Sequence, residues 1–194
     1  MALTKVGSGV IQDDAVGIAN LGATGTASAT TFLRGDNAWA TGGNTVKVAY
    51  LVDEKATTTA GGTFTSGAWR HRDLQTEYYD TIGMTFGTNT FIFPDAAGTY
   101  YIDWSCPAVA VVGHQSRLYN VTDTAVVKYG TSSRAGNNDF QTLSNGSALV
   151  TLTATATFQI EHYCSTTAAT YGFGDNTDFS VVEIYTTVKI MQIA

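Results

Sequence analysis

Residues 97–106 of this chain read Ala97-Gly98-Thr99-Tyr100-Tyr101-Ile102-Asp103-Trp104-Ser105-Cys106. Between Tyr100 and Cys106, apolar side chains occupy every second position, and the positions between them carry Tyr101 and two polar residues. Successive side chains of a β-strand point to opposite faces, so this period of two predicts a strand with one face toward an apolar interior. We expect Trp104 to lie on that face as a packing residue.

Strand-like stretches continue on both sides of this segment. The segments 117–121 and 125–129 flank a Thr-Asp-Thr turn and predict a hairpin. Turn signals recur roughly every 8 to 12 residues, and no amphipathic helix pattern is present. The sequence therefore predicts an all-β, antiparallel sandwich or barrel. The remaining strand-like stretches are 46–52, 148–155, 158–164 and 179–193.

The chain is poor in charge for its size. Only 13% of its 194 residues are charged, about half of the usual quarter. Residues 141–160 contain no charged side chain at all. We expect this stretch to lie inside the sandwich or in a subunit interface, because exposed β-prone segments without charge tend to aggregate. The low charge favours an oligomer in which other subunits cover much of the surface, although a Thr/Ser/Asn-rich β surface would give a similar composition.

Net charge and hydropathy argue against two classes of partner. The net charge is −6 and no basic stripe is present, so the chain lacks the Lys and Arg that sequence-independent nucleic-acid binding requires. The longest apolar run, residues 106–112, is too short to cross a bilayer. Residues 1–5 lack the long apolar stretch of a signal peptide. We expect neither nucleic-acid binding nor membrane insertion, and synthesis in a cytoplasm.

The first 45 residues differ from the rest. They are rich in Gly, Ala, Ser and Thr, and no apolar period continues for more than a few residues. We expect 1–45 to be an extended anchoring arm and 46–194 to be the head domain. A linker ordered only by contacts would have the same composition. The arm residues expected to hold a partner are the larger apolar ones: Ile11, Val16, Leu21, Phe32, Leu33 and Trp39.

No catalytic or metal-binding pattern is apparent. The three histidines, His71, His114 and His162, lie far apart and show none of the spacings of a zinc site. His162 alternates with core residues and is expected to be a hydrogen-bonded core histidine. His114 precedes a strand together with Arg117 and could line an interface or a ligand patch, although a structural role is favoured. We expect no enzyme, no metal and no cofactor.

The two cysteines do not form a disulfide framework. Cys106 and Cys164 each fall in phase with the apolar residues of a predicted strand. We expect them to pack as free thiols in a reducing compartment. The alternative is a disulfide bond between them that forms after release from the cell.

Two stretches resemble bacteriophage proteins. Gly25-Thr26-Ala27-Ser28-Ala29-Thr30-Thr31-Phe32-Leu33-Arg34-Gly35-Asp36-Asn37-Ala38-Trp39-Ala40 is similar to a segment that recurs in tail-fibre and fibre-like proteins. Pieces spread over 61–188 resemble the fibre-tip domain with a complement-head or tumour-necrosis-factor-like jelly roll; among them are 61–70, 97–100, 114–123, 161–164 and 182–185. Cys106 departs from this pattern, because a small residue such as Ala is expected there.

The resemblance implies a two-sheet jelly roll whose three copies pack around an axis, with aromatic residues sealing the seam. The family shares no catalytic residues. It implies a structural component of a virion, assembled in the host bacterial cytoplasm: a short trimeric fibre or a decoration protein of capsid or tail, attached to other virion proteins through the arm.

The alternative is a receptor-binding tail-fibre tip that recognises a glycan or protein on the host surface. Sugars stack on aromatic rings, so aromatic residues near predicted loops are candidates for such contacts. The residues expected to contact a ligand or an interface are Tyr78, Tyr79, His114, Arg117 and Tyr171.

Overall fold

The computed structural model describes residues 22–41, 46–94, 97–136 and 140–193. The chain divides into two compact units, Met1–Thr45 and Val46–Ala194, which are described separately. Every regular element in the described residues is a β-strand. The strands are β1 (Thr31–Leu33), β2 (Trp39–Thr41), β3 (Lys47–Lys55), β4 (Arg70–His71), β5 (Thr76–Asp80), β6 (Thr85–Gly87), β7 (Thr90–Phe93), β8 (Gly98–Val109), β9 (Val112–Asn120), β10 (Ala125–Ala135), β11 (Gln141–Leu152), β12 (Ala156–Cys164) and β13 (Glu183–Gln192).

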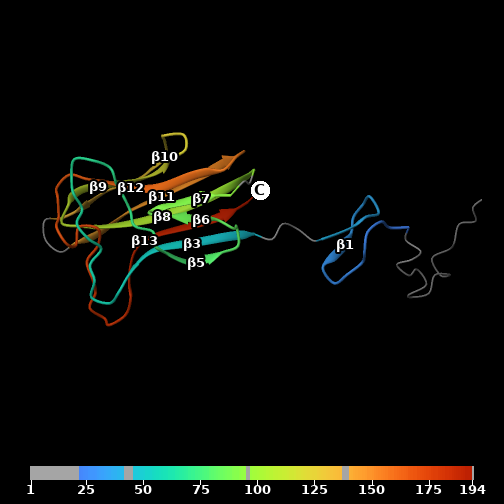
Figure 1. Cartoon of the computed structure of the whole chain (residues 1–194), viewed down its shortest axis with the longest axis horizontal. Helices are drawn as coiled ribbons and strands as arrows, with labels where there is room; N and C mark the ends of the chain where they lie inside the picture. The colour runs from blue at the N-terminus through green and yellow to red at the C-terminus, as the bar shows by residue number, and fades with distance from the viewer. Residues whose placement is uncertain (1–21, 42–45, 95–96, 137–139, 194) are drawn as a thin grey trace, which may run out of the picture. The chain divides into compact units, whose positions relative to one another are not determined.

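The second unit is a sandwich of two antiparallel sheets, whose strands overlap in the view of Figure 1. The five-stranded sheet has the order β11-β8-β13-β3-β5, and the six-stranded sheet has the order β10-β9-β12-β7-β6 with β4 paired to β12. From β3 onward, every connection passes from one sheet to the other except those between β6 and β7 and between β9 and β10. This strand order is that of a jelly roll, and it confirms the predicted fold class.

Apolar side chains from both sheets fill the space between them. Tyr100, Ile102 and Trp104 project inward from β8 and are at most 1% exposed. The indole Nε1 of Trp104 donates a hydrogen bond of 2.8 Å to Ser116 Oγ on β9, so its only polar atom is satisfied inside the core. The prediction that Trp104 is a packing residue is confirmed.

The cysteines also behave as predicted. Cys106 and Cys164 are both fully buried free thiols. Burial raises the pKa of each to about 11, which keeps the thiols protonated and unreactive near neutral pH.

Several strand boundaries differ from the sequence prediction. The hairpin predicted at 117–121 and 125–129 is present, but β9 and β10 extend it to Val112–Asn120 and Ala125–Ala135. The strand predicted at 148–155 begins earlier, at Gln141, since all twelve residues of β11 pair with β8. The short strands β5, β6 and β7 were not predicted, because their polar or short segments carry too little periodicity to be recognised.

The described part of the first unit, residues 22–41, contains a small hairpin. The strands β1 and β2 pair antiparallel, with Leu33 opposite Trp39. The turn between them is closed by hydrogen bonds from Asn37 N to Arg34 O (3.0 Å) and from Arg34 N to Ala38 O (2.9 Å). The expected arm is therefore not uniformly extended, because this turn folds its second half back on itself.

Candidate functional site

One outer face of the sandwich is apolar and open. It belongs to the five-stranded sheet, and we call it the seam face. A row of apolar side chains runs across it, because the strand registers place Leu149 opposite Tyr101, Tyr101 opposite Met191, and Met191 opposite Val48. Leu149 is 65% exposed and Met191 40% exposed. The seam face consists of Val48, Tyr50, Tyr101, Asp103, Leu149, Lys189 and Met191.

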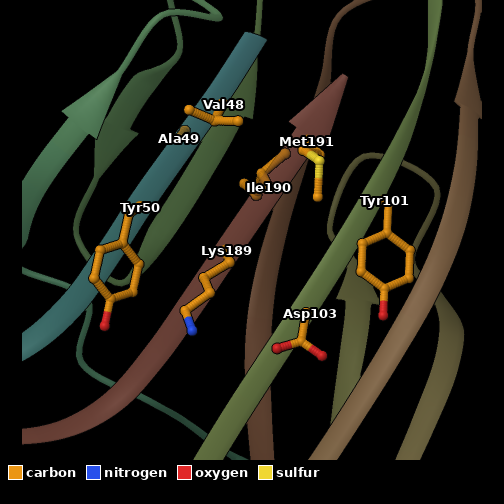
Figure 2. A pocket seen from close by; sticks show the side chains of 8 residues that line it. All are labelled: Val48, Ala49, Tyr50, Tyr101, Asp103, Lys189, Ile190 and Met191. Atoms are coloured by element: carbon orange, nitrogen blue, oxygen red, sulfur yellow. The ribbon is translucent and has the colours of Figure 1, made fainter. Parts of the chain in front are cut away.

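The next row of the seam face adds one charge of each sign. Asp103 on β8 lies opposite Lys189 on β13, and Lys189 lies opposite Tyr50 on β3. The Lys189 ammonium is 5.6 Å from the centre of the Tyr50 ring, within the range of a cation–π contact. In Figure 2 these side chains border a shallow apolar hollow, with the two tyrosines on the strands that flank β13.

The outer face of the six-stranded sheet has a different chemistry. Here Arg117 lies at the centre of a group of aromatic rings, and its guanidinium carbon is 4.0 Å from the centre of the Trp69 ring and 5.0 Å from that of Tyr119. Arg117 Nε donates to Glu161 Oε2 at 2.5 Å. We call this group the Trp69 cluster; its members are Trp69, Arg117, Tyr119, Tyr129, Glu161 and Tyr163.

Two tyrosines flank the indole of the Trp69 cluster. The ring centre of Tyr163 lies 5.5 Å and that of Tyr129 lies 5.9 Å from the ring centre of Trp69. Tyr129 is 51% and Tyr163 38% exposed. The cluster thus exposes the aromatic rings to solvent. The ion pair of Arg117 and Glu161 lies beneath them and is mostly covered.

Polar groups inside the sandwich form a third arrangement. His114 Nδ1 and His162 Nε2 are 2.9 Å apart, and His114 Nε2 is 2.7 Å from Thr142 Oγ1. Burial, followed by the positive charge of Arg72, lowers the pKa of His114 to about 4. The same two causes, with His114 as a third, lower the pKa of His162 well below its ordinary value. Both rings are neutral at pH 7, which suits a structural pair and confirms His162 as a core histidine.

Arg72 is a buried charge that the sequence analysis did not identify. Its side chain is fully buried, and its Nε donates to Thr186 Oγ1 at 2.6 Å while Nη2 donates to Phe173 O at 2.8 Å. The guanidinium also lies 4.2 Å from the centre of the Phe173 ring. These contacts offset part of the cost of burying the charge, although Nη1 has no hydrogen-bond partner among the described residues.

The structure does not bring the predicted ligand residues of the head together. Tyr78 and Tyr79 lie on β5, at an edge of the five-stranded sheet, where the Tyr78 hydroxyl donates to Glu54. Tyr171 lies in the loop between β12 and β13. His114 points into the sandwich and is only 5% exposed, so it contributes to no open patch. Of these residues, only Arg117 belongs to an exposed cluster.

The predicted arm residues lie partly outside the described part of the chain. Ile11, Val16 and Leu21 fall in the undescribed residues 1–21. Phe32 is 49% exposed, and Leu33 and Trp39 are half-buried cross-strand neighbours in the hairpin.

Sequence reasoning missed most of the Trp69 cluster. One signal was available: Arg117 and Tyr119, like Glu161 and Tyr163, occupy alternate positions on their strands, so each pair shares a face. Nothing in the sequence indicated that Trp69 would cover them.

Within the described residues, no group of three or more His, Cys, Asp or Glu side chains is placed to bind a metal ion. The described residues also include no helix of the length and hydropathy needed to cross a membrane.

Comparisons with known proteins give likenesses of structure only. No protein-family model matches the sequence, and no curated protein matches it. The globular domain of zebrafish complement 1qA protein is 16% identical, with a TM-score of 0.49 over 76% of this chain and 98% of its own. The PRD1 vertex protein P5 is 12% identical, with a TM-score of 0.49 over 78% and 100%. Murine APRIL at pH 8.5 is 8% identical, with a TM-score of 0.46 over 77% and 100%. At these values the strand order itself, and not the likeness, carries the assignment of the fold.

Proposed function

We propose that this chain is a non-enzymatic, homotrimeric structural component of a bacteriophage particle. It serves as a short fibre or as a decoration protein of the capsid or tail. The observation that carries the proposal is the seam face, where Leu149, Tyr101, Met191 and Val48 form an apolar row across one open sheet. Burying a Leu or Met side chain contributes about 1.5–3 kcal/mol, so three copies that cover these rows stabilise one another.

The edge strand β11, which carries Leu149, supports the proposal that a second copy of the chain covers the seam face. An exposed edge strand presents unpaired backbone groups, and proteins usually guard such edges with charges, with prolines or by keeping the strand short. The edge strands β5 and β10 carry charged residues, and β6 has only three residues. By contrast, β11 is an edge strand of twelve residues without a charge or a proline. Near the middle of β11, Asn145 N donates to Thr131 Oγ1 of β10, and we propose that a second copy covers the rest of this edge.

The charges of the seam face suit packing against an identical copy. Asp103 and Lys189 lie side by side in the strand register, and neither forms an ion pair with another described residue. In a closed ring each copy presents one surface to a different surface of its neighbour. The lysine of one copy can then meet the carboxylate of the next.

The assignment to a phage particle rests on the first unit. Residues 25–40 resemble a segment of phage fibre proteins, and their apolar residue Phe32 stays 49% exposed within this unit. We propose that the arm uses such side chains to join other virion proteins. The protein is then found in the virion, after assembly in the cytoplasm of the host bacterium.

Light scattering tests the trimer directly. The wild-type chain is expected to have the mass of a trimer at micromolar concentration. The double variant Leu149→Glu/Met191→Glu is expected to be a monomer, because it places two carboxylates in the seam face of every copy. Phe179→Glu is the matched control, since Phe179 is 77% exposed in the loop before β13; it should remain a trimer.

A wild-type chain of monomer mass contradicts the proposal. A double variant that still forms a trimer would show that the copies associate through another surface.

Receptor binding is the second candidate function. The Trp69 cluster favours it, because exposed aromatic rings gather there on the sheet opposite to the seam face.

A further inference from the structure

The Trp69 cluster combines features that a sugar-binding surface needs. We propose that it binds an uncharged pyranose sugar, as a unit of a polysaccharide or oligosaccharide. This inference concerns the outer face of the six-stranded sheet and does not depend on trimer formation through the seam face.

The cluster is rigid before any ligand arrives. Arg117 is held between the rings of Trp69 and Tyr119, with its guanidinium carbon 4.0 Å and 5.0 Å from their centres. Its Nε bonds to Glu161, whose other carboxylate oxygen accepts a hydrogen bond of 2.7 Å from Gln159 Nε2. Because these side chains are already fixed, little conformational entropy remains to be lost on binding.

The accessible surface of the cluster is made of ring faces. Tyr129 lies on β10 and Tyr163 on β12, the two strands that flank β9. Both rings approach Trp69 at a tilt, with interplanar angles of 43° and 55°. Tyrosine offers a large apolar ring with few rotatable bonds and a hydroxyl at its tip. The C–H groups of a pyranose ring pack against such a face, and its hydroxyls bond to polar groups at the rim.

Polar groups for those hydroxyls lie beside the rings. Within the described residues, Arg117 bonds through Nε only, so its two Nη groups keep their donors. Gln159 bonds through Nε2 only, so its carbonyl oxygen remains an acceptor. Gln115, opposite Tyr163 in the register, donates its Nε2 to Gly130 O at 2.9 Å and adds only its carbonyl oxygen as an acceptor.

The chemistry of this face favours a sugar over a protein partner. The apolar row of the seam face is mostly aliphatic or thioether, with one aromatic ring, Tyr101, beside Leu149, Met191 and Val48; such a row suits a dry protein interface. The Trp69 cluster instead mixes aromatic rings with amides and hydroxyls. It also favours an uncharged sugar, because Glu161 neutralises Arg117 and the chain as a whole has a charge of −6, which repels anionic polymers.

The test uses the full-length protein on an array of defined neutral oligosaccharides from bacterial surface polysaccharides. We expect at least one oligosaccharide to be retained, and its dissociation constant is then measured by titration. Tyr129→Ala and Tyr163→Ala are expected to weaken binding about tenfold or more, as for truncation of an aromatic anchor. Tyr171→Ala is the matched control, because Tyr171 has the same 38% exposure as Tyr163; its binding should match that of the wild-type chain.

Melting temperature and light scattering accompany each titration, since the two binding variants alter exposed rings and should fold and assemble normally. The inference is overturned if the protein retains no oligosaccharide on the array. It is also overturned if both variants bind the oligosaccharide as tightly as the wild-type chain does. If Tyr129→Ala or Tyr163→Ala instead changes the number of subunits in the oligomer, as measured by light scattering, the cluster is a protein interface and the inference is wrong. Each of these outcomes leaves the wild-type trimer test unaffected.

Discussion

Close contact between two neighbouring residues explains a glycine in the middle of β11. Gly146 lies opposite Trp104 in the register of β11 and β8. A Cβ atom built on Gly146 would lie 2.0 Å from Trp104 Cζ2, whereas carbon atoms in contact are normally about 3.5–4.0 Å apart. The indole therefore occupies the space that any other side chain at this position would need.

Gly146→Ala should destabilise the protein by about 1–3 kcal/mol or more, because the core must shift to admit one methyl group. Chemical denaturation measures the loss. Ser147→Ala, one residue along and on the exposed face, is the control and should stay close to wild type. In a Trp104→Leu background the same glycine change should cost clearly less, since the two positions share one space. If Gly146→Ala has the same free energy of unfolding as the wild-type chain, the contact with Trp104 does not restrict the side chain at this position.

At the scale of elements, the histidine pair joins three strands. His114 lies on β9, His162 on β12 and Thr142 on β11, so the hydrogen bonds of this group link the two sheets. The free energy of this link depends on both rings staying neutral, because burial and Arg72 oppose a further positive charge.

We expect the histidine pair to make stability fall in acid. The folded-state pKa of His114, about 4, lies below its ordinary value of 6.5, so between these values the unfolded chain binds more protons than the folded one. The full contribution is present above pH 6.5 and is lost as the pH falls toward 4. The slope is about 1.4 kcal/mol per pH unit for each histidine that stays neutral.

Urea unfolding at a fixed protein concentration between pH 7 and pH 4 measures this slope. The carboxylates of the chain also titrate at the acid end, so the informative quantity is the difference from His162→Gln. This variant should show a shallower decline because it has one buried histidine fewer. Parallel declines for the two proteins would contradict the assignment.

At the scale of the whole molecule, the two units have separate tasks in the proposed function. The jelly roll contains its own core and the seam face, all within Val46–Ala194.

Deletion of residues 1–40 should therefore leave a folded, trimeric head that does not join the particle. Circular dichroism and light scattering check the head. Incorporation is measured by blotting purified particles from cells that supply either the truncated or the full-length chain. Incorporation of the truncated head at the full-length level would show that the arm is not the anchor.

Strand type and core faces could be predicted from sequence because alternation is a local property. The alternation around Trp104 and around His162 placed both side chains in the interior, where the structure has them 1% and 0% exposed. Short strands such as β6 could not be predicted, because three residues do not establish a period.

The candidate sites needed the tertiary structure. The sequence selected Arg117 and His114 together because they are three residues apart, yet the pleat of β9 sends them to opposite faces. Likewise, residues 141–160 were expected to lie inside the sandwich or in a subunit interface. The structure divides them: Ile160 lies in the core, while Leu149 projects from the seam face.

The sequence by itself determined that this chain forms an all-β, antiparallel fold, and which side chains share a face of each long strand. Only the tertiary structure decided which strands are neighbours. In a jelly roll β9 pairs with β12, so His114 meets His162 across 48 residues, and the loop before β4 carries Trp69 over Arg117. The physical reason is that a period of two is set by the backbone of one strand, whereas pairing and register depend on how all the faces pack at once.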